Sequence, residues 1–143
     1  MIKTIVHYSD LHLKLYKYHE RDKSILESAL NDWKKIKPDR IVFTGDLVHS
    51  KNQMTPELIR LLSWWMTETA KICPTVYLIG NHDFLENNQD RLDAITPIVE
   101  NLNNKNITYY KNKGCYEDDN VMWCVYSLVE ENGKPALYAC TRL

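Results

Sequence analysis

The stretch IVFTGDLVHS, residues 41–50, decides the predicted fold. Its first residues are apolar and β-branched or aromatic, which is typical of a buried strand. Gly45 then permits a sharp turn that presents Asp46 just beyond the strand, and His49 follows three residues later. A single aspartate in this place could simply cap the next helix. A polar site is the other interpretation, and the rest of the chain decides between the two.

The same pattern occurs twice more along the chain. TIVHYSDLH, residues 4–12, ends a strand on Asp10 and His12, and TVYLIGNHD, residues 75–83, ends one on Asn81, His82 and Asp83. Asp10 and His12 stand two apart in a segment expected to be extended, so both side chains should leave the same face. Functional residues of open parallel sheets gather beyond the carboxyl ends of the strands. Three polar clusters at such ends indicate a site rather than helix capping.

Strands and helices are predicted to alternate through the first half of the chain. Strands are expected at residues 2–8, 40–44 and 75–79, a helix at 22–36, and a second helix from Thr55-Pro56 to just before Pro74. Strands separated by helices imply a parallel sheet with right-handed crossovers.

The second half is expected to change character. It contains a loop (84–95), a short helix from Thr96-Pro97, and two strands (107–110 and 121–129) joined by the polar turn 111–120. The predicted fold class is α/β, a single domain over residues 1–143 with a mixed, mostly parallel sheet flanked by helices.

The composition limits the classes of function. The 143 residues suffice for one domain, and 44% hydrophobic with 26% charged residues is ordinary for a globular protein. A formal net charge of -1 argues against coating a nucleic acid through bulk charge. No signal peptide or membrane span is visible, so we expect a cytoplasmic protein without membrane contact. The four cysteines form no CxxC pair and are expected to be reduced thiols that fill the core: Cys73, Cys115, Cys124 and Cys140.

The residue types at the three strand ends suit a metal centre. Carboxylate, imidazole and amide oxygen together favour divalent ions such as manganese, iron or zinc. A carboxylate can bridge two ions about 3.5–4 Å apart, and such pairs assist phosphoryl transfer. Asp46 follows the central strand and is the natural bridge.

The motifs SDLH, TGDLVH and IGNHD resemble the calcineurin-like metallophosphoesterase superfamily, whose pattern is D-x-H, G-D and then G-N-H-D or G-N-H-E. Over roughly residues 3–130 the chain looks like the DNA-repair nuclease branch, the SbcD-type nuclease subunit with its phage and viral counterparts. The resemblance implies a metallophosphoesterase-type layered α/β sandwich. It also implies exo- and endonucleolytic hydrolysis of DNA in repair and recombination.

The resemblance assigns roles to single positions. Asp10 and His12 would hold the first ion, Asp46 would bridge both ions, and Asn81 would hold the second. The two ions would be Mn²⁺ first, with Fe²⁺ or Zn²⁺ as alternatives. The implied partners are DNA, an SMC-like ATPase subunit of the SbcC type, and a second copy of the chain in a homodimer. A viral protein of this kind would act in the host-cell cytoplasm.

The catalytic residues implied by the resemblance are His82 and Asp83. His82 would approach the scissile phosphate and protonate the leaving oxygen, and Asp83 would orient His82. Residues after the motifs are candidates for contact with the substrate: His49, Lys51, Asn52 and Arg91. Residues 14–23, KLYKYHERDK, mix basic and aromatic side chains that could meet phosphates and bases, although a solvated loop would look similar.

The chain departs from the family pattern after residue 83. The family continues with a lone His and then G-H-x-H, but the last of the five histidines here is His82. We therefore expect a form interrupted before the last two histidine motifs. Two alternatives stay open: a phosphatase or nucleotide phosphodiesterase of the same superfamily, and a non-catalytic remnant that binds DNA or a partner.

Overall fold

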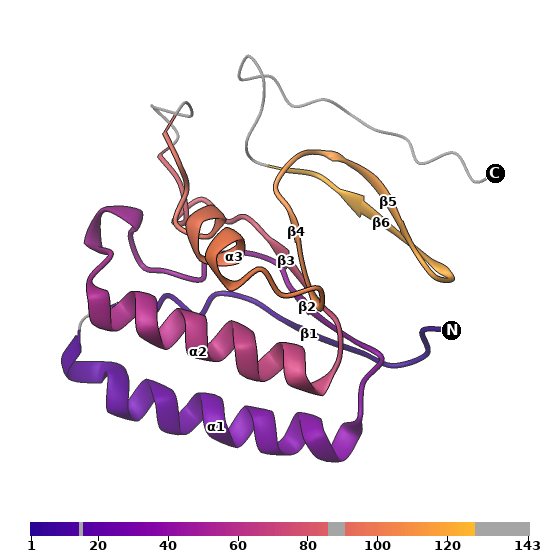
Figure 1. Cartoon of the computed structure of the whole chain (residues 1–143), viewed down its shortest axis with the longest axis horizontal. Coiled ribbons are helices and arrows are strands. Elements are labelled where there is room, and N and C mark those ends of the chain that lie inside the picture. The colour runs from indigo at the N-terminus through magenta and orange to yellow at the C-terminus, as the bar shows by residue number, and fades with distance from the viewer. Residues whose placement is uncertain (15, 86–90, 128–143) are drawn as a thin grey trace.

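The computed structural model describes residues 1–14, 16–85 and 91–127. In chain order the elements are β1 (Ile5–Tyr8), η1 (Tyr16–Tyr18), α1 (His19–Ile36), β2 (Arg40–Phe43), η2 (Lys51–Gln53), α2 (Pro56–Ile72), β3 (Thr75–Leu78), α3 (Thr96–Leu102), β4 (Ile107–Tyr110), β5 (Gly114–Asp118) and β6 (Val121–Val125) (Figure 1). None of the helices in this described part of the chain combines the length and apolar content that a membrane span requires.

The main sheet has four parallel strands in the order β1-β2-β3-β4. Val42 of β2 lies in register with His7 of β1 and Val76 of β3. The predicted α/β class with a parallel sheet flanked by helices is confirmed. Antiparallel pairing was expected in the same sheet, but in the described residues it occurs only between β5 and β6, which form a separate sheet.

The three α-helices share one buried core with one face of the sheet. Trp65 of α2, Phe43 of β2 and Tyr77 of β3 are fully buried in it, and Leu30 of α1 and Ile98 of α3 join them. Figure 1 shows α1 and α2 running side by side along this face. The predicted start of α2 is confirmed because the Thr55 side chain accepts a hydrogen bond from the Leu58 backbone N–H at 3.2 Å.

Half of the region predicted as a polar turn, residues 111–120, is strand. β5 occupies Gly114–Asp118, and only Asp119 and Asn120 separate it from β6. Asp119 has a φ of 56°, a conformation that two-residue hairpin turns require. The prediction was wrong because β5 contains one aromatic residue, Tyr116, next to the acidic Glu117 and Asp118, so the apolar content of the strand looked low. Residues 126 and 127 lie beyond β6, and 128–129 lie outside the described residues.

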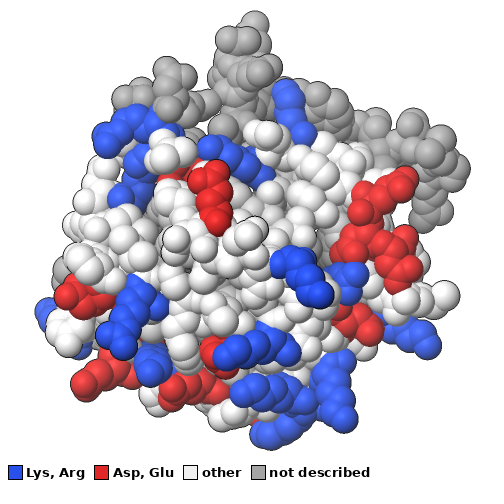
Figure 2. All heavy atoms as spheres, in the orientation of Figure 1, with Lys and Arg blue, Asp and Glu red and all other residues white. Residues whose placement is uncertain are grey.

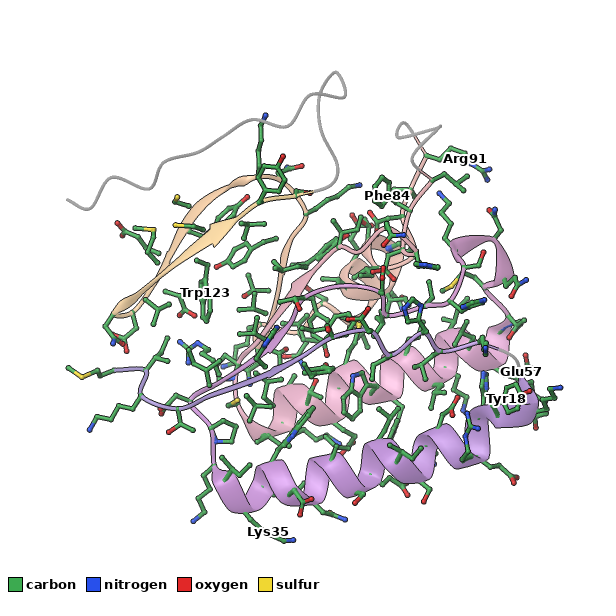
Figure 3. All side chains as sticks on the ribbon, turned by 180° about the vertical axis from the view of Figure 1, so that it is seen from behind. Tyr18, Lys35, Glu57, Phe84, Arg91 and Trp123 are labelled. Carbon is green, nitrogen blue, oxygen red and sulfur yellow. The ribbon has the colours of Figure 1, made fainter. Side chains whose placement is uncertain are left out.

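Polar contacts hold the β5–β6 hairpin across the other face of the sheet. Arg40 of β2 donates to both Asp118 carboxylate oxygens at 2.6 and 2.8 Å, and Trp123 Nε1 donates to the same carboxylate at 3.0 Å. Trp123 lies between the hairpin and the sheet (Figure 3). A cavity of about 290 Å³ remains between the two, lined by side chains such as Val42 and Val76. This face is therefore less tightly packed than the helical one.

The charges on the surface are mixed, as the net charge of -1 predicts. In Figure 2, Lys and Arg side chains are interspersed with Asp and Glu over the face that carries α1 and α2. Pairs along the helices include Lys35 with Asp32 at 2.8 Å and Lys71 with Glu68 at 2.6 Å. Such exposed pairs contribute little to stability and suit a solvated surface.

Candidate metal centre

Three of the predicted metal ligands have left-handed backbone conformations. The φ angles are 58° at Asp10, 46° at His12 and 62° at Asp46. This corrects the expectation that residues 10–12 are extended. Outside glycine, such conformations cost of the order of 1–3 kcal/mol and concentrate at functional sites. Backbone hydrogen bonds hold them, from Asp10 N to Gly45 O and from His12 N to Asp46 O, each 3.0 Å.

Two glycines let the loops after β2 and β3 approach each other. Gly45 has a φ of 113°, and a Cβ added there would lie 2.7 Å from Gly80 Cα. Gly80, unlike Gly45, does not have a positive φ, so it is not needed there for a sharp turn. Its role is close approach, because a Cβ on Gly80 would collide with the Asp46 backbone N and carboxylate. The two loops therefore contact each other directly at the site.

Asp10, His12 and Asp46 bring their ligand atoms together beyond the strand ends. His12 Nε2 lies 3.6 Å from Asp10 Oδ1 and 3.7 Å from Asp46 Oδ2. These separations are too long for hydrogen bonds. They match the roughly 3.5 Å expected between two ligands that each lie about 2.1 Å from one ion. All three ligand atoms lie within 4.8 Å of one another, so the group fits a divalent ion.

A second group of possible ligands shares His12. The rings of His12, His49 and His82 also bring nitrogen atoms within 4.8 Å of one another. His82 lies edge-on to His12 with 4.6 Å between ring centroids, and it stacks on His49 at 5.8 Å. His12 Nδ1 is buried without a hydrogen-bond partner in the described residues. The other ring nitrogen, Nε2, is the atom next to the carboxylates, and imidazole with carboxylate is a donor set that manganese, iron or zinc favour.

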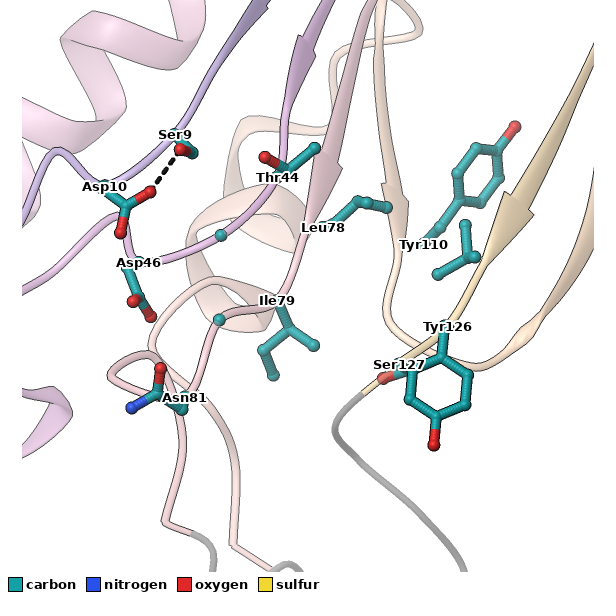
Figure 4. Close-up of a pocket in the computed structure, with 13 residues that line it drawn as sticks. Ser9, Asp10, Thr44, Asp46, Leu78, Ile79, Asn81, Tyr110, Tyr126 and Ser127 are labelled. Atoms are coloured by element: carbon teal, nitrogen blue, oxygen red, sulfur yellow. Dashed lines mark hydrogen bonds between the residues drawn. The ribbon is translucent and has the colours of Figure 1, made fainter. Parts of the chain in front are cut away.

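Asn81 lies at the mouth of a cavity of about 220 Å³ that also borders Asp10 and Asp46. Figure 4 shows these three side chains along one edge of the cavity and hairpin residues along the other. The cavity is lined by Ser9, Asp10, Thr44, Gly45, Asp46, Leu78, Ile79, Gly80, Asn81, Tyr110, Val125, Tyr126 and Ser127. The structure thus brings all four predicted metal ligands to one site.

Within the described part of the chain, the hydrogen bonds of the Asp83 carboxylate go to backbone N–H groups and not to the His82 side chain, which corrects its expected role. Its buried carboxylate accepts hydrogen bonds from the backbone N–H groups of Asp46, Val48 and Gly80 at 2.9 to 3.1 Å. Burial raises the pKa of Asp83 to about 6, although these three bonds act in the opposite direction. Asp83 therefore fastens the loop after β2 to the loop after β3.

The His82 ring contacts the His49 backbone carbonyl. This contact takes the place of the one that was expected from Asp83. His82 Nδ1 lies 2.7 Å from His49 O, and the His82 backbone N–H donates to Asp46 Oδ1 at 3.0 Å. With a proton on Nδ1, the His82 ring would donate a hydrogen bond to this carbonyl, and Nε2 would not take part in the contact. The loop after β2 therefore sets both the position and the ring orientation of His82.

The other predicted substrate contacts have different surroundings. His49 is exposed within the histidine group, as expected for a residue near the site. Lys51 Nζ instead donates to Leu92 O at 2.5 Å, and burial lowers its pKa, with Arg91 contributing to the shift. Asn52 is exposed on η2, and Arg91 is exposed at the edge of the described residues (Figure 3). Contact of these four residues with a substrate stays a prediction.

Sequence reasoning missed the residues that close the cavity. Ser9 donates to the Asp10 carboxylate, but a serine before the D-x-H motif carries no distinctive pattern. Tyr126 and Ser127 reach the cavity because the hairpin folds back over the sheet, and Ser127 Oγ donates to Lys111 O at 2.5 Å. Only the three-dimensional path of the chain could have revealed these contacts.

The chain belongs to the calcineurin-like phosphoesterase family, whose model matches residues 3–135. It is 33% identical over 135 residues to the uncharacterized protein R555 of Acanthamoeba polyphaga mimivirus. That match covers 92% of this chain and 10% of the viral protein, so the chain spans about a tenth of this relative. The crystal structure of the Pseudomonas putida nuclease MPE is also similar, with a TM-score of 0.48 and 18% identity over 79% of this chain and 49% of that chain.

Proposed function

We propose that this chain carries catalytic residues of a metal-dependent nuclease that hydrolyses phosphodiester bonds in DNA. The observation that carries the proposal is the convergence of Asp10, His12 and Asp46 beside Asn81 and His82 at the strand ends. Family membership supports phosphoester hydrolysis as the reaction. DNA as the substrate follows from the resemblance of the motifs to repair nucleases.

The roles of the metal ligands are those that the resemblance to the family implies, and the positions of Asp10, His12 and Asp46 support them. Asp10 and His12 would hold one divalent ion, and Asp46, whose other carboxylate oxygen accepts from the His82 N–H, would be shared with a second ion held by Asn81. Mn²⁺ is the first choice because the donors mix hard carboxylate and amide oxygens with imidazole. When bound, such ions supply positive charge for the developing phosphorane and lower the pKa of coordinated water.

His82 would act as the general acid. With Nδ1–H directed to the His49 carbonyl, the protonated ring carries its second proton on Nε2. Donation of that proton to the leaving oxygen needs only a short approach of the substrate, and the backbone contact keeps the ring from turning. Asp83 contributes indirectly, since it holds the loop that carries Asp46.

Two features favour a polymeric substrate over a small phosphate ester. The Asp10 side chain is 65% exposed, so the site is open to a large molecule. The second feature is the basic and aromatic segment 14–23. It begins directly after Leu13, whose carbonyl accepts a hydrogen bond from the His49 backbone N–H. There the Lys17 ammonium and the Arg21 guanidinium lie 4.8 and 5.0 Å from the centroid of the Tyr18 ring. Such groups suit a nucleic-acid backbone.

The proposal extends to the assembly. An SbcD-type nuclease subunit would act with an SMC-like ATPase of the SbcC type and would pair with a second copy of itself. This chain spans about a tenth of its mimiviral relative, and the histidines that the family's last two motifs would supply are not among the described residues. Co-purification of a tagged chain with the ATPase expressed from the same source would test the partnership.

Hydrolysis assays test the proposed reaction. The purified chain is incubated with Mn²⁺ and linear duplex DNA, single-stranded DNA or p-nitrophenyl phosphate. We expect DNA cleavage that EDTA abolishes and that Asp46→Asn and His82→Asn each reduce by at least about 100-fold. Asp32→Asn is the control, because this exposed aspartate lies on α1 and pairs only with Lys35 among the described contacts.

Two other results of these assays would assign a different function to the chain. Cleavage of p-nitrophenyl phosphate without cleavage of DNA would replace the nuclease by a phosphatase of the same family. DNA binding without any hydrolysis, unchanged in Asp46→Asn, would contradict the enzyme assignment for this polypeptide and favour a binding role.

A further inference from the structure

The β5–β6 hairpin places two cysteines directly opposite each other, away from the proposed metal centre. Cys115 of β5 pairs with Cys124 of β6 in the antiparallel register, and their Sγ atoms lie 3.2 Å apart. Both residues are exposed, whereas their neighbours Tyr116 and Trp123 are half-buried. The expectation that the cysteines fill the core is therefore wrong for this pair, although Cys73 is buried as expected. Cys140 lies outside the described residues.

The backbone geometry of the pair suits a disulfide. Directly opposed residues of antiparallel strands have Cα atoms about 4.5 or 5.5 Å apart, and disulfides span about 4.4–6.8 Å between Cα atoms. An S–S bond is about 2.0 Å long, so the two sulfur atoms at 3.2 Å need to approach by only about 1.2 Å more. Side-chain rotation supplies such a movement without a change of the strand register.

We propose that Cys115 and Cys124 form a reversible cross-strand disulfide when the chain meets a small disulfide oxidant such as oxidised glutathione. One cysteine thiolate attacks the glutathione disulfide and releases one glutathione thiolate, which leaves a mixed disulfide. The second cysteine thiolate then attacks the protein sulfur of that mixed disulfide. The Cys115–Cys124 bond forms, and the second glutathione leaves. The protein loses two electrons and two protons, and glutathione disulfide gains them.

The disulfide would act on the wall of the cavity beside the metal centre. Val125 ends β6, and it lines this cavity together with Tyr126 and Ser127, which follow the strand and lie across the cavity from Asp46. A covalent link one residue before Val125 would restrict the opening of the hairpin. The formation of the bond itself does not depend on the proposed nuclease function.

Thiol mapping of the full-length chain tests the proposal. The chain carries Cys140→Ser so that this fourth cysteine cannot compete, and the wild-type chain is treated in parallel. After incubation with oxidised glutathione, remaining thiols are alkylated and the chain is analysed by intact mass and peptide mapping. We expect Cys115 and Cys124 to escape alkylation, a mass about 2 Da below that of the reduced, unalkylated chain, a linked peptide pair containing both cysteines, and full reversal by dithiothreitol. Amide exchange in β5 and β6 should slow by about tenfold or more.

Two internal controls accompany the measurement. Cys73 should not react before denaturation, because burial raises the pKa of its thiol to about 11. Cys115→Ser should convert Cys124 into a stable mixed disulfide with glutathione. Circular dichroism of each variant establishes that it is folded. Glutathione adducts without a cross-link in the Cys140→Ser chain, a link to Cys73, or no reaction at all would each overturn the proposal.

Discussion

The two faces of the parallel sheet differ in how they are covered. On the helical face, Phe43, Trp65 and Tyr77 are fully buried. On the hairpin face, Ile5 is 42% exposed, and cavities of about 290 and 220 Å³ lie under or beside the hairpin. The helical face therefore supplies stability, and the hairpin face leaves room for movement. The metal ligands lie where the two meet, on loops that the packed face holds in place.

Replacement of one tryptophan on each face should give the largest difference between the faces in the free energy of unfolding. Trp65→Ala removes a fully buried ring that also donates to Tyr8 Oη at 3.0 Å, and should lower the free energy of unfolding by about 4 kcal/mol. Trp123→Ala on the hairpin should cost only about 1–2 kcal/mol, since the residue is partly exposed. Urea denaturation followed by circular dichroism measures both values. Equal losses would contradict the contrast between the faces.

Replacement of two glycines by alanine should give a difference in stability of intermediate size. Gly45→Ala adds a Cβ that would lie 2.7 Å from Gly80 Cα, at a φ of 113°, and should destabilise the fold by about 3 kcal/mol. Gly114→Ala in the hairpin meets only the Tyr116 ring at 3.3 Å, which can shift, so a loss below about 1 kcal/mol is expected. The same urea titrations apply. A tolerated Gly45→Ala would show that the contact between the two loops is not required.

A small effect that depends on pH is expected from the Asp118 carboxylate, which holds the hairpin to the sheet. The hydrogen bond from Arg40 holds the pKa of the Asp118 carboxyl below its usual range. A depressed folded-state pKa means that the contribution is present above the unfolded value of about 3.9 and is lost as the pH falls through the folded value. Asp118→Asn should remove about 1 kcal/mol at pH 7 and much less in acid.

Amide exchange localises that loss. In Asp118→Asn, exchange should accelerate in β5 and β6 but not in β2 or β3, because Arg40 and Trp123 tie the hairpin to the sheet through this carboxylate. Asp32→Asn, on the solvent side of α1, is the matched control. Uniform acceleration over the whole chain would mean that the hairpin folds together with the sheet.

The sequence predicted the parallel part of the fold well because its patterns are local. Thr55-Pro56 starts α2, and Pro74 follows its end, as their backbone chemistry requires. The order of strand and helix then determines the parallel sheet. The hairpin was predicted poorly since Arg40 and Asp118, which hold it, are 78 positions apart, and such pairs leave no mark in a short window of sequence.

In the site too, features set by short motifs were predicted, and features set by distant contacts were not. Asp10, His12, Asp46, Asn81 and His82 were found from short motifs, and the structure brings them together. The left-handed backbone at Asp10 and His12 was not foreseen, because it results from hydrogen bonds to the loop after β2. The prediction that Asp83 orients His82 was wrong, and the cause is related. Its partners are backbone N–H groups, which every residue offers and no motif distinguishes.

Binding of Mn²⁺ tests most directly whether Asp10, His12 and Asp46 form a metal centre. Titration followed by electron paramagnetic resonance of free Mn²⁺ should give saturable binding to the chain. Asp46→Asn should weaken that binding by at least about tenfold, since it removes the more buried of the two charged ligands beside His12, whereas Asp32→Asn should bind as the parent does. Equal affinity in Asp46→Asn and the parent would contradict the assigned centre, whatever activity the chain displays.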